Sequence, residues 1–328
     1  EAFAEASTSS PMVMAYEPGM GVPEQLPLYL LAGAQQQLGY ANITLDADGF
    51  VRRQQLVSND GTAESLAARL IALSNGQAWN GAEFAAGKSA ELKLGDRGIP
   101  TDKDHAMEIA YYGPAGTFPR ISMIDALRAA EANDDATLQK MFAGKTVLVG
   151  TLESSDRQPT PFYRATTEPQ QTPGVEIHAN VVAALQEGRF LRHSPAGFTL
   201  LLMILLAAFG ATLARWSESQ RRLAFGLGGL VALIAVYLLT ATVSMRSGYI
   251  LPGVPVLLAL TFSAGATYAA SSLTEGKQRR LLQEVFGRYV SDNVAEELLH
   301  YGDIPLGGRD QMRSEEHTSE LQSHHDLV

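Results

Sequence analysis

The stretch AGFTLLLMILLAAFGATLARWSESQRRLAFGLGGLVALIAVYLLTATVSMRSGYILPGVPVLLALTFSAGATYAA, residues 196–270, decides the architecture of this 328-residue chain. It contains three uncharged segments, 196–214, 223–243 and 249–270, and each could cross the roughly 30 Å of bilayer hydrocarbon as a helix. Buried helices of a soluble protein are the alternative, but three in tandem would need an unusually large core. The sequence therefore predicts three closely linked transmembrane helices.

The basic residues beside these spans predict their orientation in the membrane. Six lie on one side and three on the other: Arg215, Arg221, Arg222, Lys277, Arg279 and Arg280 against Arg189, Arg192 and Arg246. Cytoplasmic flanks of transmembrane helices carry an excess of Lys and Arg, so the C-terminal side is predicted to be cytoplasmic. An odd number of spans then places residues 1–194 outside the cytoplasm.

The composition of the N-terminal part excludes several classes of function. Residues 1–194 carry 15 Lys and Arg against 23 Asp and Glu, without a basic patch, which argues against a nucleic-acid partner. The chain has no cysteine, which excludes disulfides, thiolate nucleophiles and Cys-based zinc sites. It begins at Glu1 without a Met or a signal-peptide pattern, so we expect a preceding segment to be missing.

The first predicted elements of this domain are a hairpin and a helix. Residues 38–57, LGYANITLDADGFVRRQQLV, predict two strands that turn at 46–49, because short polar residues and Gly there permit the turn. Thr62 is placed to cap a helix that begins near Leu66, and MEIAYYG at 107–113 predicts another strand.

The remaining predicted elements indicate the fold class. Ser122 can cap the helix IDALRAAE at 124–131. KTVLVG at 145–150 predicts a strand buried on both faces, and GVEIHANVVAALQEG at 174–188 predicts a helix. Because strands and helices alternate, we expect an α/β domain followed by an all-α membrane segment.

The polar loop 151–173 is the best candidate for a ligand site. Long loops that follow strands in α/β domains are where ligands tend to bind, although a solvated linker is an equal alternative. Its candidate ligand-binding residues are Glu153, Ser154, Asp156 and Thr160.

No catalytic or metal site is predicted. His178 shares a helix face with Val181, Val182 and Leu185, which is typical of a core or interface histidine. A hydrolase triad drawn from Ser154, Ser155, Asp156 and His178 would lack the Gly-x-Ser-x-Gly elbow.

Several short motifs, in their order along the chain, resemble those of one known family. LDADGFVRR at 45–53, GKTVLVGTLESSDRQPTPF at 144–162 and TPGVEIHANVVAAL at 172–185, followed by three spans, are similar to the second family of CHASE domains. Roughly residues 20–275 carry the resemblance. It implies a bacterial inner-membrane protein whose extracytoplasmic sensor domain, residues 1–194, binds an unknown ligand. Family members usually begin with a cytoplasmic tail and a further transmembrane helix, and their loop is often Gly-rich where this chain has Glu153-Ser154-Ser155.

Residues 277–312 resemble the beginning of a class III nucleotide cyclase domain, through FGRYVSDNVAEELL at 286–299 and LGGRDQ at 306–311. The resemblance implies two metal ions, Mg or Mn, on aspartates downstream of Gln311. This chain itself is therefore expected to hold no catalytic residue and no cofactor, and Asp303 and Asp310 precede the expected metal ligands.

An apolar stripe marks the helix that leads out of the third span. It consists of Leu282, Val285, Phe286, Tyr289, Val290 and Val294. A parallel partner helix in a homodimer would bury it, or it packs on its own domain.

The last residues, RSEEHTSELQSHHDLV at 313–328, change abruptly in composition. They resemble the translation of a common short-read sequencing adapter, so we expect them not to belong to the natural protein. A natural acidic tail is the alternative.

Together these patterns predict a transmembrane receptor whose sensor regulates a cytoplasmic class III cyclase that converts ATP or GTP to a cyclic nucleotide. A kinase output is the first alternative. A transporter or structural membrane protein is disfavoured, because the spans contain no charged residue.

Overall fold

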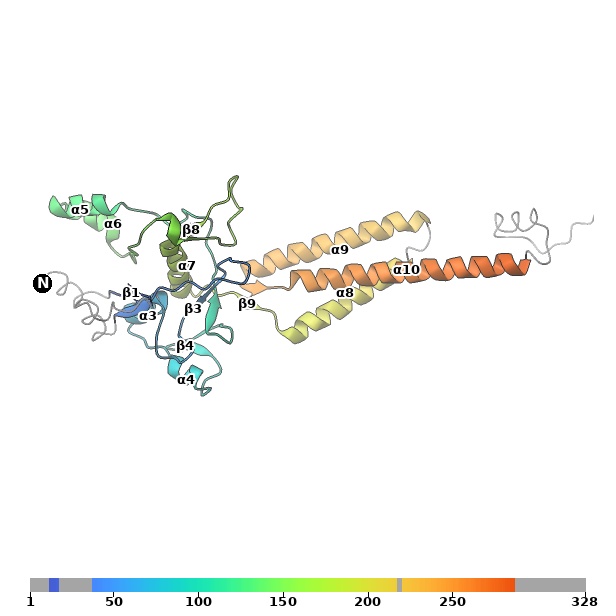
Figure 1. Ribbon diagram of the computed structural model, residues 1–328, viewed down its shortest axis with the longest axis horizontal. Helices are drawn as coiled ribbons and strands as arrows, with labels where there is room; N and C mark the ends of the chain where they lie inside the picture. Colours follow the sequence, from blue (N-terminus) through green and yellow to red (C-terminus); the bar gives the residue numbers. More distant parts are fainter. Residues whose placement is uncertain (1–11, 18–36, 217–219, 287–328) are drawn as a thin grey trace, which may run out of the picture.

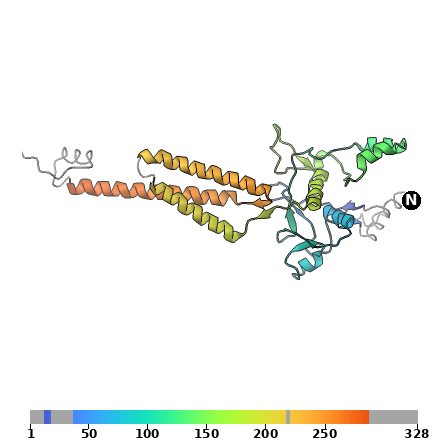
Figure 2. The ribbon, with the colours of Figure 1, turned by 180° about the vertical axis from the view of Figure 1, so that it is seen from behind.

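The computed structural model describes residues 12–17, 37–216 and 220–286. The N-terminal domain lies at one end of an elongated molecule, and three long helices extend away from it (Figure 1). Figure 2 shows the same arrangement from behind, again with the N-terminal domain at one end and the long helices extending from it.

Short strands and short helices alternate in the N-terminal domain. Its strands are β1 (Met14–Tyr16), β2 (Leu38–Tyr40), β3 (Arg53–Gln55), β4 (Leu92–Leu94), β5 (Arg97–Ile99), β6 (Ala106–Glu108), β7 (Arg157–Gln158), β8 (Thr172–Pro173) and β9 (Arg192–His193). Its helices are α3 (Leu66–Asn75), α4 (Gly81–Ala85), α5 (Met123–Glu131), α6 (Asp135–Phe142), the 3-10 turn η2 (Ser154–Asp156) and α7 (Gly174–Glu187).

The described strands form separate pairs and not one continuous sheet. β1 and β2 are parallel, whereas β3–β6, β4–β5 and β7–β8 are antiparallel. The domain thus mixes α and β elements as predicted, but its strands do not build the broad sheet that is typical of α/β domains.

The core lies between α3 and α7 and the strand pairs. Ile71 of α3 and Ile177, Val181 and Leu185 of α7 are almost fully buried, with Leu56 and Met107 from the β3–β6 region beside them. Ser65 caps α3 through its side chain, which accepts from Ala68 N at 3.2 Å, so the predicted cap Thr62 was wrong. The predicted helix at 174–188 is confirmed as α7.

The predicted hairpin at 38–57 was wrong, although its turn is present. Gly49, with φ +78°, donates to Asp46 O at 2.8 Å. Arg52 binds Asp46 and Asp48, and its side-chain hydrogen bonds lower the pKa of Asp48 to about 2. The flanking strands take other partners, since β2 pairs with β1 and β3 pairs with β6.

The predicted buried strand at 145–150 was also wrong. Val147 is 48% exposed and Val149 is 77% exposed, and only Leu148 packs against the core. No described strand pairs with the segment. The strand predicted at 107–113 is confirmed only in its first two residues, which belong to β6.

The three predicted spans correspond to α8 (Ala196–Trp216), α9 (Gln220–Arg246) and α10 (Gly253–Phe286). In the most apolar 18-residue stretch of each helix, only 6%, 11% and 11% is buried inside the protein, respectively. Such exposure suits helices that are surrounded by lipid. The third helix begins at Gly253 and not at 249, because Tyr249–Ile250 form strand β10, which pairs with β9, and Pro252 follows.

α8 and α10 pack closely through small residues. A Cβ on Gly210 would lie 2.8 Å from Leu260 O, and Ser263 Oγ donates to Ala207 O at 2.6 Å. Close backbone approach at small residues is a common way for helices to associate in a bilayer. On α10, Leu282 of the predicted apolar stripe is 48% exposed; the other five stripe side chains lie outside those that the structure describes.

Candidate functional site

A buried glutamate organises the N-terminal end of α7. Glu176 is 4% exposed and accepts hydrogen bonds from Gly116 N at 2.8 and 3.0 Å and from Phe118 N at 3.4 Å. The Arg120 guanidinium also donates to it. A carboxylate that accepts from several backbone N–H groups and a guanidinium is well satisfied in a buried position. Glu176 therefore holds the loop 113–120 against α7.

Asn180, one turn further along α7, strengthens this attachment. Its side-chain oxygen accepts from Tyr112 N at 2.9 Å, and its amide donates to Glu176 O at 2.8 Å. Because buried polar groups must be paired, these bonds fix where the loop leaves β6 and meets α7.

A cleft of about 420 Å³ opens between this loop and the loop that follows β7. Among the described residues, the charged side chains that line it are both arginines, Arg120 and Arg157. The lining also includes Gly116, Tyr163, Gln170 and Gln171. Guanidinium, amide and phenol groups are hydrogen-bond donors, so the cleft suits a small anionic or strongly accepting ligand.

The loop that forms one wall of the cleft is closed on itself. β7 pairs with β8 at its base, where Thr160 Oγ1 and Thr172 Oγ1 lie 3.2 Å apart. Within the loop, Tyr163 N donates to Thr160 O at 2.8 Å and Gln170 N donates to Tyr163 O at 2.9 Å. These bonds hold Tyr163 and Gln170 in fixed positions at the cleft.

The four residues predicted for ligand binding lie beside the cleft and do not line it. Glu153 and Ser154 are exposed, and Thr160 is fully buried. Asp156 faces the start of α7, where a Cβ on Gly174 would come within 2.5 Å of its carboxylate. The predicted loop is thus part of the cleft, but through Arg157, Tyr163, Gln170 and Gln171. Sequence reasoning missed Arg120 and Arg157, because nothing in the sequence near either arginine indicates that the two line one cleft.

His178 is a core residue, as predicted. It is 5% exposed, and its Nε2 lies 3.2 Å from Ala41 O. Burial lowers the pKa of the imidazole, against smaller opposing effects of the hydrogen bond to Ala41 and of the charge of Asp156. In residues 12–17, 37–216 and 220–286 no cluster of three or more His, Asp or Glu side chains could hold a metal ion.

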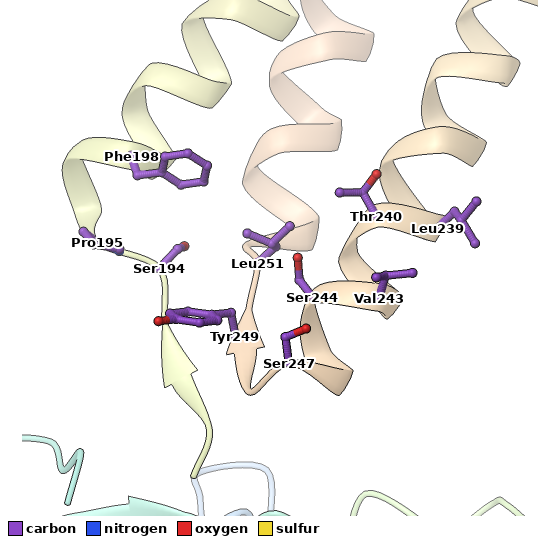
Figure 3. A pocket seen from close by; sticks show the side chains of 10 residues that line it. All are labelled: Ser194, Pro195, Phe198, Leu239, Thr240, Val243, Ser244, Ser247, Tyr249 and Leu251. Atoms are coloured by element: carbon purple, nitrogen blue, oxygen red, sulfur yellow. The ribbon is translucent and has the colours of Figure 1, made fainter. Parts of the chain in front are cut away.

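The N-terminal domain is tied to the membrane helices by a short parallel ribbon. β9, which leads into α8, pairs with β10, which leads into α10 (Figure 3). Arg192 N donates to Gly248 O at 2.8 Å, and Ser194 N donates to Ile250 O at 3.2 Å. The ribbon therefore links the exit of α7 to the start of α10 without passing through α8 and α9.

A side-chain contact joins the ribbon to the body of the domain. His193 Nε2 lies 3.1 Å from Glu108 Oε1 on β6. At the other side, Tyr237 of α9 donates its hydroxyl to Pro252 O at 2.6 Å. Contacts thus run continuously from β6 through β9 and β10 to α10.

Comparison with known proteins gives one match. The model of the CHASE2 domain matches residues 1–213, which is more than half of the chain. No curated protein matches the chain, and no solved structure does. A CHASE2 match that ends within α8, in a chain with three helices long and apolar enough to cross a membrane, agrees with the resemblance seen in the sequence. The protein is thus a member of the CHASE2 domain family.

Proposed function

We propose that this protein is the sensor and membrane portion of a bacterial receptor that controls a cytoplasmic class III nucleotide cyclase. The observation that carries the proposal is the β9–β10 ribbon, which links the ligand-facing domain directly to α10. The support for a receptor is the CHASE2 match together with three apolar helices.

The length of α10 supports a role in relaying a signal. Its 34 residues extend for about 50 Å, which exceeds the roughly 30 Å of bilayer hydrocarbon. The excess lies at the end remote from the N-terminal domain, where Lys277, Arg279 and Arg280 follow the apolar part. By the positive-inside rule, this end is the cytoplasmic one.

The packing of the bundle favours movement of α8 and α10 as a pair. Ser263, Gly210 and Leu260 lock the two helices together, and the ribbon joins the strands that precede them. A ligand that binds one arrangement of the domain more tightly would shift the equilibrium of this helix pair between two states. The free energy of the shift cannot exceed the difference between the ligand's binding free energies for the two states.

For the ligand, we propose a small anion in the cleft between Arg120 and Arg157. One side of the Arg120 guanidinium is used by Glu176. Arg157 donates to the neutral carbonyl oxygen of Leu152 at 3.2 and 3.3 Å, and no Asp or Glu of the described residues forms an ion pair with it. A carboxylate or phosphate would compensate that charge with hydrogen bonds of high strength.

The anion site is tested by measuring the binding of inorganic phosphate, acetate and succinate to the full chain in detergent. Arg157→Gln should weaken binding roughly 10- to 100-fold, the size expected for one charge-assisted hydrogen bond. Arg164→Gln is the matched control, because Arg164 is exposed on the same loop and does not line the cleft. Equal affinity in both variants, or no binding of any probe, would refute the anion site.

For the output, residues 277–286 of the stretch that resembles a cyclase belong to α10, whereas its matching motifs at 286–311 lie outside the described residues, apart from Phe286. We propose that the family's two metal aspartates, with Mg or Mn, follow Gln311, and that the receptor acts as a homodimer. The test is to read the genomic DNA beyond codon 311 and to assay the encoded product in membranes. Formation of a cyclic nucleotide from ATP or GTP with Mg or Mn is expected. A continuation without metal-binding aspartates, or phosphate transfer to protein, would reject the cyclase in favour of a kinase output.

A further inference from the structure

One polar side-chain contact fastens the β9–β10 ribbon to the body of the N-terminal domain in the described part of the chain. His193 Nε2 of β9 lies 3.1 Å from Glu108 Oε1 of β6, and no other side-chain hydrogen bond joins the described residues of β9 or β10 to the body. Phe190 and Leu191, which precede β9, pack against the core, but both residues of β9 itself are exposed. The strength of the His193–Glu108 contact therefore affects how firmly the ribbon is held.

Glu108 is the fixed partner in this contact. It lies in β6, whose pairing with β3 places it opposite Arg53, and its side chain is 21% exposed. Arg53 directs its guanidinium to Asp46 and Asp102, each at 2.7 Å. Within the described ranges, His193 is the only ion-pair partner of the Glu108 carboxylate. The carboxylate is thus held by the body of the domain and is available to the ribbon.

Glu108 is also the charged side chain that faces His193. Successive side chains of a strand point to opposite faces, so Arg192 points away from His193. On β10, Tyr249 is the register partner of Arg192, and the uncharged Ile250 is the register partner of His193. The His193 side chain is 65% exposed, so its ring exchanges protons freely with the surrounding water.

We propose that His193 and Glu108 form a pH-sensitive latch, which fastens the ribbon to β6 when the surroundings of the N-terminal domain become acidic. Histidine side chains change charge between about pH 5 and pH 8. A neutral imidazole makes an ordinary hydrogen bond to Glu108, whereas a protonated imidazole donates a charge-assisted bond and forms an ion pair. For a solvent-exposed pair, the gain strengthens the contact about two- to fivefold.

The latch acts on the strands that lead into the membrane helices. β9 precedes α8 and β10 precedes α10, and the two strands are paired. A ribbon that is held to β6 transmits a displacement of the domain to both helices, whereas a released ribbon transmits less of it. The inference rests on the proposed receptor function only for the use of this transmission, and it requires neither an anion in the cleft nor a cyclase output.

The experiment measures hydrogen exchange of the Arg192 and Ser194 amides in the full chain in detergent, at about pH 5.5 and about pH 8.5. Both amides donate within the ribbon. Each rate is divided by the rate in the same short peptide free in solution, which removes the intrinsic effects of pH and of the substitution. His193→Gln should lower the protection about two- to fivefold at the acidic pH. At the alkaline pH it should leave the protection unchanged, because Gln can also donate to Glu108.

Further variants separate a charged pair from a general loss of packing. Glu108→Gln should produce the same loss at the acidic pH, and the double variant should lose no more than either single variant, because the two side chains act as one pair. His193→Lys keeps a positive charge and should keep the protection at both pH values. Glu153→Gln is the matched control, because Glu153 is exposed and makes no hydrogen bond to the ribbon in the described part of the chain.

Three results in the ribbon amides would overturn the latch: no loss of protection in His193→Gln at either pH, an equal loss at both, or additive losses in the double variant. A matching loss of protection in α7 would also overturn it, because the substitution would then loosen the whole domain. The readout uses no anion and no nucleotide, so failure of the latch is distinguishable from failure of the anion site or of the cyclase output.

Discussion

The backbone N–H of Arg192 donates to the carbonyl oxygen of Gly248 at 2.8 Å, and this bond joins the strand that leaves the sensor domain to the turn between α9 and α10. Gly248 has φ +84°, and a Cβ there would lie 2.7 Å from Phe190 O. The turn therefore requires glycine. Its tight approach lets β9 and β10 pair, although α8 and α9 lie between the two strands in the sequence. Through this pairing the sensor domain is joined to β10, the strand that leads into α10.

The ribbon predicts a specific crosslink. His193 and Ile250 are direct partners in the parallel register, and the chain has no native cysteine. His193→Cys combined with Ile250→Cys should form an intramolecular disulfide on mild oxidation, because paired strands bring Cα atoms within disulfide range. The product is measured by peptide mass mapping. His193→Cys with Met245→Cys, in the last turn of α9, is the control and should crosslink poorly; equal yields would contradict the register.

The buried carboxylate of Glu176 predicts a loss of stability. Glu176→Gln removes the charge that pairs with Arg120 and weakens the bonds from Gly116 and Phe118. Because Arg120 is 42% exposed and solvent screens it, we expect a cost of about 2 kcal/mol, less than for a fully buried pair. The thermal midpoint of the full chain in detergent should fall by several degrees. Glu153→Gln, at an exposed position, should leave it unchanged; a similar fall in both would contradict the role of Glu176.

The contact between α8 and α10 predicts that Gly210 tolerates no larger residue. In Gly210→Val the new Cβ would lie 2.8 Å from Leu260 O, which must move. Overpacking of this kind costs about 1–3 kcal/mol. Gly228→Val is the matched control in α9, since nothing lies within 4 Å of a Cβ there. In mixed micelles, Gly210→Val should unfold at a lower fraction of SDS than the native chain does. Gly228→Val should unfold at the same fraction as the native chain.

Burial of His178 predicts a dependence of stability on pH. Burial lowers the pKa of His178 in the folded state, so the unfolded chain binds the proton more readily. Stability is therefore unaffected above the unfolded pKa of about 6.5 and decreases as the pH falls below it. His178→Gln should flatten this decrease in the thermal midpoint between about pH 7 and pH 5. An unchanged slope in His178→Gln would contradict the account and assign the pH dependence to other groups.

The membrane helices and α7 could be predicted from sequence because their signals are local. An uncharged run of about 20 residues spans a bilayer whatever surrounds it. The apolar spacing of Ile177, Val181 and Leu185 likewise defines one helix face. The family was also recognisable, although the match covers residues 1–213 and not the roughly 20–275 assigned from the sequence.

The strand pairing and the cleft could not be predicted because they depend on distant contacts. Val51 N donates to Pro159 O, and Gln54 pairs with Met107, so residues around the 46–49 turn find partners far along the chain. The 113–120 loop forms the second wall of the cleft, and hydrogen bonds from Arg120 and Gly116 to Glu176 hold it in place. Glu176 lies 56 and 60 residues further along the chain. No local pattern near the predicted ligand loop indicates that the 113–120 loop lies against it.

The orientation of the chain tests the account most directly, because a receptor requires its sensor and the end of α10 on opposite sides of the membrane. Single cysteines are introduced at Arg164 in the sensor loop and at Leu281 on α10, both exposed, in a chain without other cysteines. Spheroplasts are then treated with a thiol reagent that cannot cross the membrane. The account predicts labelling at position 164 in intact spheroplasts and at position 281 only after lysis. Labelling of both positions before lysis, or of 281 alone, would contradict it.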